Sequence, residues 1–131
     1  SSDKSVVWGG NYFPLPPSMG WLLWDKGQRD FSLADGELAW TSENRALRIF
    51  TLSRSEALKD GKVHPTQKPE DLIKWCLTLF PEAQTVLDPF AGSGTTGRAC
   101  KDLGRKCTLI ERDESYCEII AKRMGQEVFA F

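Results

Sequence analysis

Two acidic residues stand at the ends of two predicted strands, with a glycine-rich loop between them. Asp88 follows the predicted strand Thr85–Leu87, and Glu111 follows the predicted strand Cys107–Ile110. The loop fits the pattern G-x-G-x-x-G with Gly92, Gly94 and Gly97. Such glycines let a nucleotide approach the backbone closely, and an acid at the next strand end can accept hydrogen bonds from a ribose. The spacing predicts a site for NAD or S-adenosylmethionine. No Lys-Ser/Thr pair follows the glycines, which excludes a phosphate-binding P-loop.

The position of Asp88 distinguishes between the two cofactors. The pyrophosphate of a dinucleotide would lie close to this carboxylate, and two like charges ~6 Å apart at an effective dielectric of ~20 repel by roughly 3 kcal/mol. S-adenosylmethionine has no phosphate, and its sulfonium and ammonium are attracted by an aspartate. The residue types therefore favour S-adenosylmethionine. The alternatives are an Asp88 that only caps the following turn and a Glu111 that is an exposed strand-end acid.

The elements around these acids form a predicted βαβ unit. The short strand Thr85–Leu87, expected to be buried, leads through the loop into a helix over Thr95–Leu103. Gly104 is a natural helix stop, and the second strand follows. Ligands of such units lie at the carboxyl ends of the strands.

Helices are predicted on both sides of this unit. Pro69 opens the first, with Glu70 and Asp71 in its first turn. Its expected apolar face consists of Leu72, Ile73, Cys76, Leu77 and Phe80. Asp113 is expected to cap a last helix that Gly125 ends, with inward residues Tyr116, Ile119, Ile120 and Met124.

Strands are predicted in the first half of the chain. Ser5–Trp8 is the first, and the continuously apolar run Trp21–Trp24 predicts a central strand. Glu37–Thr41 and Ala46–Thr51 are expected to form an antiparallel hairpin at one edge of the sheet.

Composition indicates an ordinary globular domain. The chain has 131 residues, 40% apolar and 27% charged, and no apolar run long enough to span a membrane. Four cysteines without a C-x-x-C pair and a single histidine make a zinc site improbable and predict reduced cytosolic thiols. We expect a cytoplasmic location in a bacterium or a phage-infected cell.

Charge is unevenly distributed along the chain. The net charge is −1, but Glu43–Lys68 holds six Lys/Arg against three Asp/Glu. A basic segment on a near-neutral protein can contact phosphates, or it can be a solvated loop. The candidate DNA-binding residues are Arg45, Arg48, Arg54, Lys59 and Lys62.

Two motifs resemble a known family. Asp88–Gly97, DPFAGSGTTG, resembles the cofactor-binding motif of DNA amino-methyltransferases, which methylate adenine N6 or cytosine N4. His64–Pro69, HPTQKP, resembles the segment that precedes this motif in the β-class of those enzymes. Trp8–Lys26 and Glu37–Ser42 resemble the phage-type branch, and the resemblance covers roughly Val6–Met124.

The resemblance implies a fold and a cofactor site. The fold is α/β, a Rossmann-like S-adenosylmethionine-dependent methyltransferase with a mixed sheet. One domain is expected over residues 1–131, with 1–62 on the DNA side and 63–131 binding cofactor. The implied cofactor-binding residues are Thr66, Gln67, Lys68, Asp88, Phe90, Ala91, Gly92, Ser93, Gly94, Glu111 and Arg112.

One part of the family pattern is missing. These enzymes hold the target amine with an Asp/Asn/Ser-Pro-Pro-aromatic motif whose ring stacks on the flipped base. Leu15–Ser18, LPPS, has neither the acceptor nor the ring. The true motif and its strand would precede Val6, so we expect a chain incomplete at its N-terminus, or a reduced protein that borrows the motif from another chain. Asn11 and Tyr12 are weak candidates for contact with a base or the cofactor; otherwise they serve the turn and packing.

Three functions remain open at this point. The first is a DNA methyltransferase of a restriction-modification type, with adenine N6 as the favoured target because of the phage-type resemblance. The second is a non-catalytic S-adenosylmethionine- or DNA-binding fragment of such an enzyme. The third, an NAD-binding enzyme, is opposed by Asp88 and by the HPTQKP segment. DNA is the expected partner, and a second copy or another polypeptide could complete the sheet.

Overall fold

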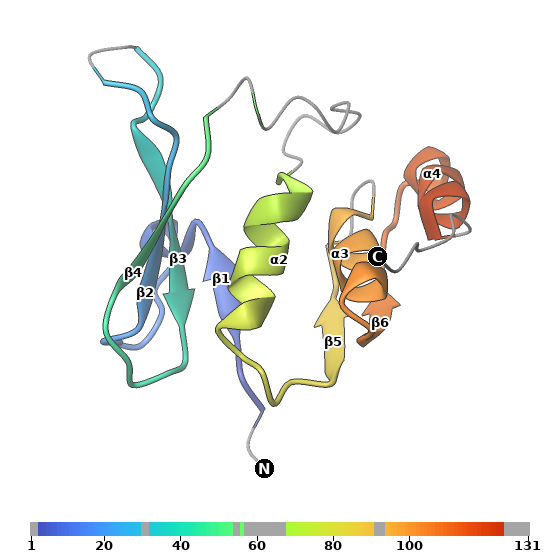
Figure 1. Ribbon diagram of the computed structural model, residues 1–131, viewed down its shortest axis with the longest axis horizontal. Helices are drawn as coiled ribbons and strands as arrows, with labels where there is room; N and C mark the ends of the chain where they lie inside the picture. Colours follow the sequence, from blue (N-terminus) through green and yellow to red (C-terminus); the bar gives the residue numbers. More distant parts are fainter. Residues whose placement is uncertain (1–2, 30–31, 54–55, 57–67, 91–93, 125–131) are drawn as a thin grey trace. The chain divides into compact units, whose positions relative to one another are not determined.

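The chain divides into two compact units, an N-terminal unit, Ser1–Glu56, and a C-terminal unit, Ala57–Phe131. The computed structural model describes residues 3–29, 32–53, 56, 68–90 and 94–124 (Figure 1). Within these residues, no helix combines the length and the hydropathy needed to cross a lipid bilayer.

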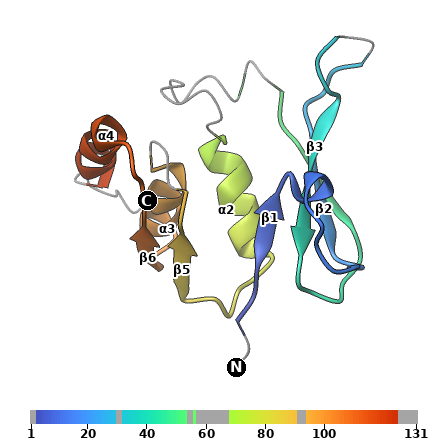
Figure 2. The same ribbon diagram turned by 180° about the vertical axis from the view of Figure 1, so that it is seen from behind.

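The N-terminal unit is built on a four-stranded mixed sheet (Figure 2). Its strands are β1 (Val6–Trp8), β2 (Trp21–Asp25), β3 (Gly36–Thr41) and β4 (Arg48–Thr51). Their order is β1-β3-β2-β4; β3 runs antiparallel to both β1 and β2, and β4 runs parallel to β2. The prediction that Trp21–Trp24 lies in the middle of the sheet is confirmed.

The expected hairpin of Glu37–Thr41 with Ala46–Thr51 is wrong. β2 lies between β3 and β4, and the connection from Ser42 to Leu47 passes the start of β2. Gly20, directly before β2, makes room for this crossing: a Cβ there would collide with the carbonyl oxygen of Glu43 and the hydroxyl of Thr41. The turn-like Ser42–Asn44 therefore belongs to a crossover, which turn composition alone does not distinguish from a hairpin.

Three tryptophan indoles tie the sheet to the segments beside it. Trp40 on β3 donates its Nε1–H to the carbonyl oxygen of Pro16 at 2.7 Å. Trp21 and Trp24 on β2 donate theirs to the carbonyls of Ser18 and Leu52, each at 3.0 Å. Trp24 is buried and the other two rings are half-buried, so their N–H groups are partly or wholly shielded from water. These bonds satisfy the N–H groups and connect the sheet to the loops that accept from them.

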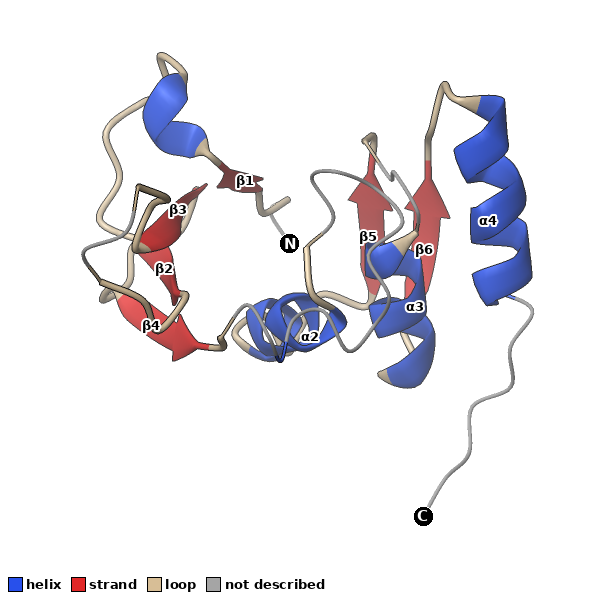
Figure 3. Cartoon of the chain, turned by 90° about the horizontal axis from the view of Figure 1, so that it is seen from above, coloured by secondary structure: helices blue, strands red, loops and turns tan. Residues whose placement is uncertain are grey.

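The C-terminal unit carries a pair of parallel strands with helices (Figure 3). Its elements are α2 (Glu70–Thr78), β5 (Thr85–Asp88), α3 (Thr95–Asp102), β6 (Lys106–Leu109) and α4 (Glu114–Met124). β5, α3 and β6 form the predicted βαβ unit, in which Val86 pairs with Cys107 and Asp88 with Leu109. Gly104, with φ 71°, follows the end of α3 as expected.

The predicted apolar face of α2 is confirmed. Pro69 is its N-cap, and Glu70 and Asp71 lie in the first turn. The five predicted inward residues are all buried: Leu72, Ile73, Cys76, Leu77 and Phe80. Two of them, Ile73 and Leu77, form a core cluster with Ala99 and Cys100 of α3, against which Val86 and Cys107 pack.

The expectation that Thr85–Leu87 is a buried strand is wrong. Leu87 is 62% exposed, and Ile110, on the same face by strand alternation, is 52% exposed. Only the opposite face, with Val86 and Cys107, packs against the core cluster. A continuously apolar strand predicts burial on both faces, but in the described structure this pair is covered on one.

Candidate functional site

Asp88 lies at the carboxyl end of β5 and is held on both of its oxygens. Its Oδ1 accepts the backbone N–H of Phe90 at 3.0 Å, and its Oδ2 accepts the hydroxyl of Thr96 at 2.7 Å. A carboxylate has about four acceptor positions, so each oxygen can accept another hydrogen bond. Asp88 therefore caps its turn, as in the simpler interpretation, and keeps its negative charge available at the strand end.

Gly94 begins α3 beside this carboxylate. It is the N-cap residue with φ 89°, a conformation that costs a side-chain-bearing residue roughly 1–2 kcal/mol. Its carbonyl accepts the N–H of Arg98 at 3.0 Å. Ala91, Gly92 and Ser93 lie outside the described residues, so Gly94 and Phe90 mark the two ends of the predicted cofactor loop.

Glu111 lies at the same carboxyl end of the strand pair as Asp88. The N–H of Ile110 donates to the backbone oxygen of Asp88 at 2.9 Å, which extends the pairing beyond β6. The half-buried Glu111 follows, and its Oε2 accepts the N–H of Asp113 at 2.9 Å. Asp113 in turn accepts the N–H of Ser115 at 3.0 Å and so caps α4, as predicted. The two acids that sequence spacing selected therefore stand at the carboxyl ends of the two paired strands.

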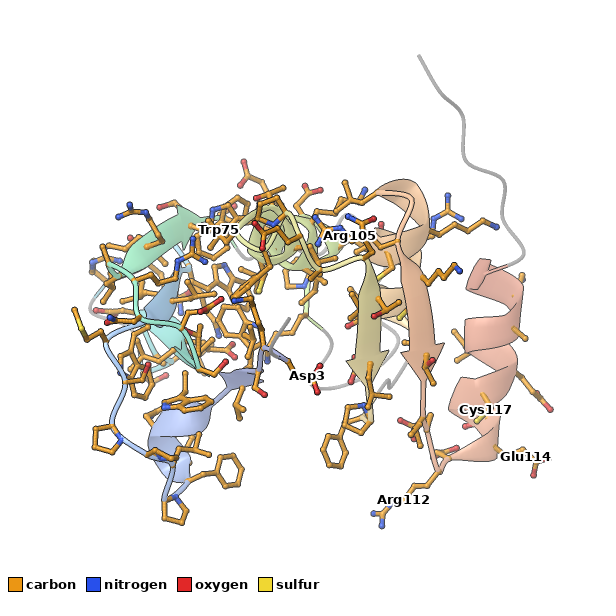
Figure 4. The ribbon with its side chains drawn as sticks, turned by 90° about the horizontal axis from the view of Figure 1, so that it is seen from below. Asp3, Trp75, Arg105, Arg112, Glu114 and Cys117 are labelled. Atoms are coloured by element: carbon orange, nitrogen blue, oxygen red, sulfur yellow. The ribbon has the colours of Figure 1, made fainter. Side chains whose placement is uncertain are left out.

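The other predicted cofactor residues differ in position. Phe90 is 88% exposed beside Asp88. Arg112 is exposed between β6 and α4, and its side chain points outward (Figure 4). Lys68 is half-buried and directly precedes the N-cap of α2. Thr66 and Gln67 lie outside the described residues.

Two of the five predicted DNA-binding residues fall in the described part of the chain. Arg45 lies on the connection between β3 and β4, and its side chain runs past Gly20. Arg48 is exposed at the start of β4. Arg54, Lys59 and Lys62 lie outside the described residues.

Asn11 and Tyr12 occupy a short helical turn. This turn, η1 (Gly10–Tyr12), follows β1, and both side chains are exposed. It belongs to the N-terminal unit, whereas Asp88 and Glu111 belong to the C-terminal unit.

An ion-pair cluster links α2 to α3, the helix that follows the cofactor loop. The Nζ of Lys74 on α2 lies 2.8 Å from Oδ2 of Asp102, and the Nη2 of Arg98 lies 3.0 Å from its Oδ1. Burial raises the pKa of Asp102, but both cations outweigh it and the pKa lies below its ordinary value. The hydrogen bond to Asp102 raises the pKa of Lys74. Arg105, labelled in Figure 4, follows α3, and its Nη1 donates a hydrogen bond to the carbonyl oxygen of Phe80 at 3.0 Å.

The cysteines near the site are free thiols. Cys107 on β6 lies against Cys100 on α3, and the hydrogen bond between the two, together with burial, raises the pKa of Cys107. The same hydrogen bond lowers the pKa of Cys100. Because Cys100 is fully buried in the core cluster and Cys107 packs against it, this pair acts as packing.

Sequence reasoning missed Thr96. Its hydroxyl holds Asp88 from the first turn of α3, eight residues along the chain. The only indication was a hydroxyl residue just after the glycine loop, where a helix N-terminus faces the end of the preceding strand.

Comparisons with known proteins agree with the geometry. The family model of N6/N4 DNA methylases matches residues 5–122. The Type II methyltransferase M2.DpnII of Streptococcus pneumoniae is 46% identical over 76% of this chain and 45% of its own length. The Type II methyltransferase M.HinfI of Haemophilus influenzae is 45% identical over 64% of this chain and 25% of its own length. This chain thus spans less than half the length of these curated relatives.

Solved structures support the fold. The crystal structure of the M1.HpyAVI–SAM complex matches with a TM-score of 0.61 and 27% identity over 81% of this chain and 61% of that one. The cytosine-N4-specific PvuII DNA methyltransferase matches with a TM-score of 0.63 and 18% identity over 86% of this chain and 52% of that one. The expected α/β methyltransferase fold is confirmed.

Proposed function

The chain belongs to the N6/N4 DNA methylase family, and we propose that it binds S-adenosylmethionine as part of an enzyme that methylates an exocyclic base amine of DNA. Adenine N6 is the favoured target because of the resemblance to the phage-type branch. The two units together form the methyltransferase domain, with the C-terminal unit as its cofactor-binding part. The two curated relatives come from bacteria, which supports a role in the cytoplasm of a bacterial or phage-infected cell.

The observation that carries this proposal is the placement of Asp88 and Glu111 at the carboxyl ends of the paired strands β5 and β6. Asp88 is aligned by Phe90 and Thr96, and the backbone bond between Ile110 and Asp88 brings Glu111 alongside. Two carboxylates at these strand ends repel a pyrophosphate but suit a ligand that carries a sulfonium, an ammonium and a ribose. This charge pattern favours S-adenosylmethionine over NAD.

The residues have separate roles in this proposal. Asp88 attracts the positive charges of the cofactor, and Glu111 accepts hydrogen bonds from the ribose hydroxyls. The exposed ring of Phe90 packs against the adenine or the thioether. When bound, S-adenosylmethionine supplies an activated methyl group to the base amine, with no covalent bond to the enzyme. Positioning by these groups supplies most of the rate.

Isothermal titration calorimetry tests the cofactor. S-adenosylmethionine should bind and NAD should not. Glu111→Ala should weaken binding by roughly 10- to 100-fold, because a charged hydrogen-bond pair worth roughly 2–3 kcal/mol is lost. Glu114→Ala is the matched control: it removes the same charge from an exposed position three residues further on. Tight NAD binding without S-adenosylmethionine binding would overturn the proposal.

A second candidate function is a non-catalytic binding part of such an enzyme, favoured by the structural role of Leu15–Ser18. Pro16 accepts the indole of Trp40, and Ser18 donates its hydroxyl to the carbonyl of Thr41 at 2.6 Å. This segment therefore connects its loop to β3 by hydrogen bonds, and it has no side chain that could hold the target amine. A tritiated-methyl assay of this chain on mixed-sequence duplex DNA should stay at background, and robust methylation would reject the second function.

A DNA surface on the N-terminal unit completes the proposal. Arg45 and Arg48 lie on one continuous stretch that enters β4. Binding should be weak and strongly salt-dependent, because phosphate contacts release counterions. Charge reversal at both arginines should abolish a gel shift at low salt, while reversal at Arg29, which pairs with Asp25, should leave it.

A further inference from the structure

The loop between β1 and β2 exposes large apolar side chains that the function proposed above does not use. This aromatic loop, Gly9–Gly20, carries Tyr12 at 84%, Phe13 at 58% and Met19 at 70% exposure. Neighbouring exposed apolar residues on a folded surface mark an interaction site more often than single ones do. Tyr12 ends the short helical turn η1 and Phe13 is its extended C-cap residue, so the loop exposes two rings at consecutive positions.

The aromatic loop is fixed at both of its ends by hydrogen bonds. Its first part is tied by the N–H of Gly9 to the carbonyl of Leu38 at 2.8 Å, and by the N–H of Tyr12 to the carbonyl of Gly9 at 2.9 Å. Its second part is tied by the bonds from Trp40 to Pro16 and from Ser18 to Thr41. The exposed rings are therefore presented by a preorganised backbone, and a ligand would not have to order the loop.

The chemistry of the aromatic loop fits a nucleobase. From Ser5 to Trp24 no residue is charged, so no carboxylate on this segment repels a phosphate backbone. Arg45 and Glu43 both lie beside Gly20 at the far end of the loop, and Glu43 is paired with Lys4. Asn11 adds an exposed amide, which can donate to and accept from a base edge. Two rings and an amide on an uncharged segment together suit a base on a nucleic-acid strand better than an aliphatic protein surface.

The geometry points to the aromatic loop as a base-stacking element, in which Tyr12 and Phe13 stack on unpaired bases of a DNA strand. This inference rests on the proposed function, since it assigns the contact that holds DNA bases near the enzyme. Stacking tolerates any base, so it positions the strand without specifying a sequence.

Fluorescence anisotropy with two single-stranded probes tests the inference. One probe is a 12-mer of deoxyadenosine, and the other is a 12-mer of abasic sites with the same phosphates. Because the phosphate contribution cancels in the ratio of the two affinities, this ratio measures stacking alone. The protein should prefer the base-bearing probe about 10-fold, as expected for a stacked base.

Variants separate stacking from general adhesion and from folding. Tyr12→Ala with Phe13→Ala should reduce the ratio to near one, and Tyr12→Phe should keep it, because a phenylalanine ring also stacks. Met19→Ala, at an equally exposed position of the same loop, should keep it within twofold. An unchanged ratio in the double variant, or no preference in the unmodified chain, would overturn the inference. Calorimetry without S-adenosylmethionine binding would instead overturn the proposed function and leave this ratio unaffected.

Discussion

The aromatic loop and the β5–β6 strand pair both expose large apolar side chains, but they hold them differently. In the loop, Tyr12 and Phe13 stand on a backbone that is braced by hydrogen bonds to β3. In the strand pair, Leu87 and Ile110 are part of the strands and lie on a face that the core cluster does not cover. The first is built for contact with a ligand, and the second is a surface that sheet packing normally covers.

The largest expected effect is a difference in the free energy of unfolding between variants on the covered and the exposed side of the β5–β6 pair. Leu77→Ala should lower the free energy of unfolding by roughly 2–5 kcal/mol, because it opens a cavity in the cluster of α2 with α3. Leu87→Ala, which also removes a leucine side chain, should change it by less than about 0.5 kcal/mol at protein concentrations low enough for the chain to be monomeric. Urea denaturation measures both. Equal losses would show that the Leu87 face is as well packed as the Leu77 face.

A side chain at Gly20, where the aromatic loop enters β2, should destabilise the crossing of the β3–β4 connection. Gly20→Ala should cost roughly 1–3 kcal/mol, because its Cβ would press on the Glu43 carbonyl and the Thr41 hydroxyl. The control is Ala46→Val at an exposed position of the same β3–β4 connection, with an expected change below about 0.5 kcal/mol. A Gly20→Ala variant of undiminished stability would remove the steric explanation for the crossing.

The open face of the β5–β6 pair should drive association. Among the described residues of its unit, β5 is paired with β6 alone, so its other edge and the Leu87 face can bind a partner strand or a second copy. Light scattering should report a dimer or larger assembly, and Leu87→Lys with Ile110→Lys should raise the dissociation constant by about 10-fold or more. Tyr12→Lys with Met19→Lys, at the aromatic loop, should not. A stable monomer at every concentration would defeat this use of the face.

The smallest effect concerns the end of β2. Arg29 donates to both carboxylate oxygens of Asp25 at 3.0 Å, and this bond, with the N–H of Gly27, lowers the pKa of Asp25 to about 2. Because the folded-state pKa is depressed, ionised Asp25 stabilises the folded protein at pH values above the unfolded pKa of about 4. This stabilisation is lost as the pH falls toward 2. Melting temperatures from pH 5 to 2 should fall slightly less steeply in Asp25→Asn. An identical slope would show that this exposed pair contributes nothing.

The sequence predicted local chemistry well and long-range pairing poorly. The spacing of Asp88, the glycines and Glu111 is local to one βαβ unit, whose topology brings both strand ends together. The position of β4 was not predictable, because whether Ser42–Leu47 forms a hairpin or a crossover depends on the room that Gly20 leaves. The exposure of Leu87 was equally out of reach, since an apolar strand does not specify how many of its faces are covered.

The distribution of tryptophan gives the two units separate optical signals. Four of the five tryptophans, Trp8, Trp21, Trp24 and Trp40, lie in the N-terminal unit, and the fifth, Trp75, lies on α2 (Figure 4). Helices α2, α3 and α4 lie in the C-terminal unit. Intrinsic fluorescence therefore follows mainly the N-terminal unit during denaturation, and circular dichroism at helical wavelengths follows the C-terminal unit. Coincident transitions would mean that the two units unfold as one cooperative body, and separated transitions would give each unit its own stability.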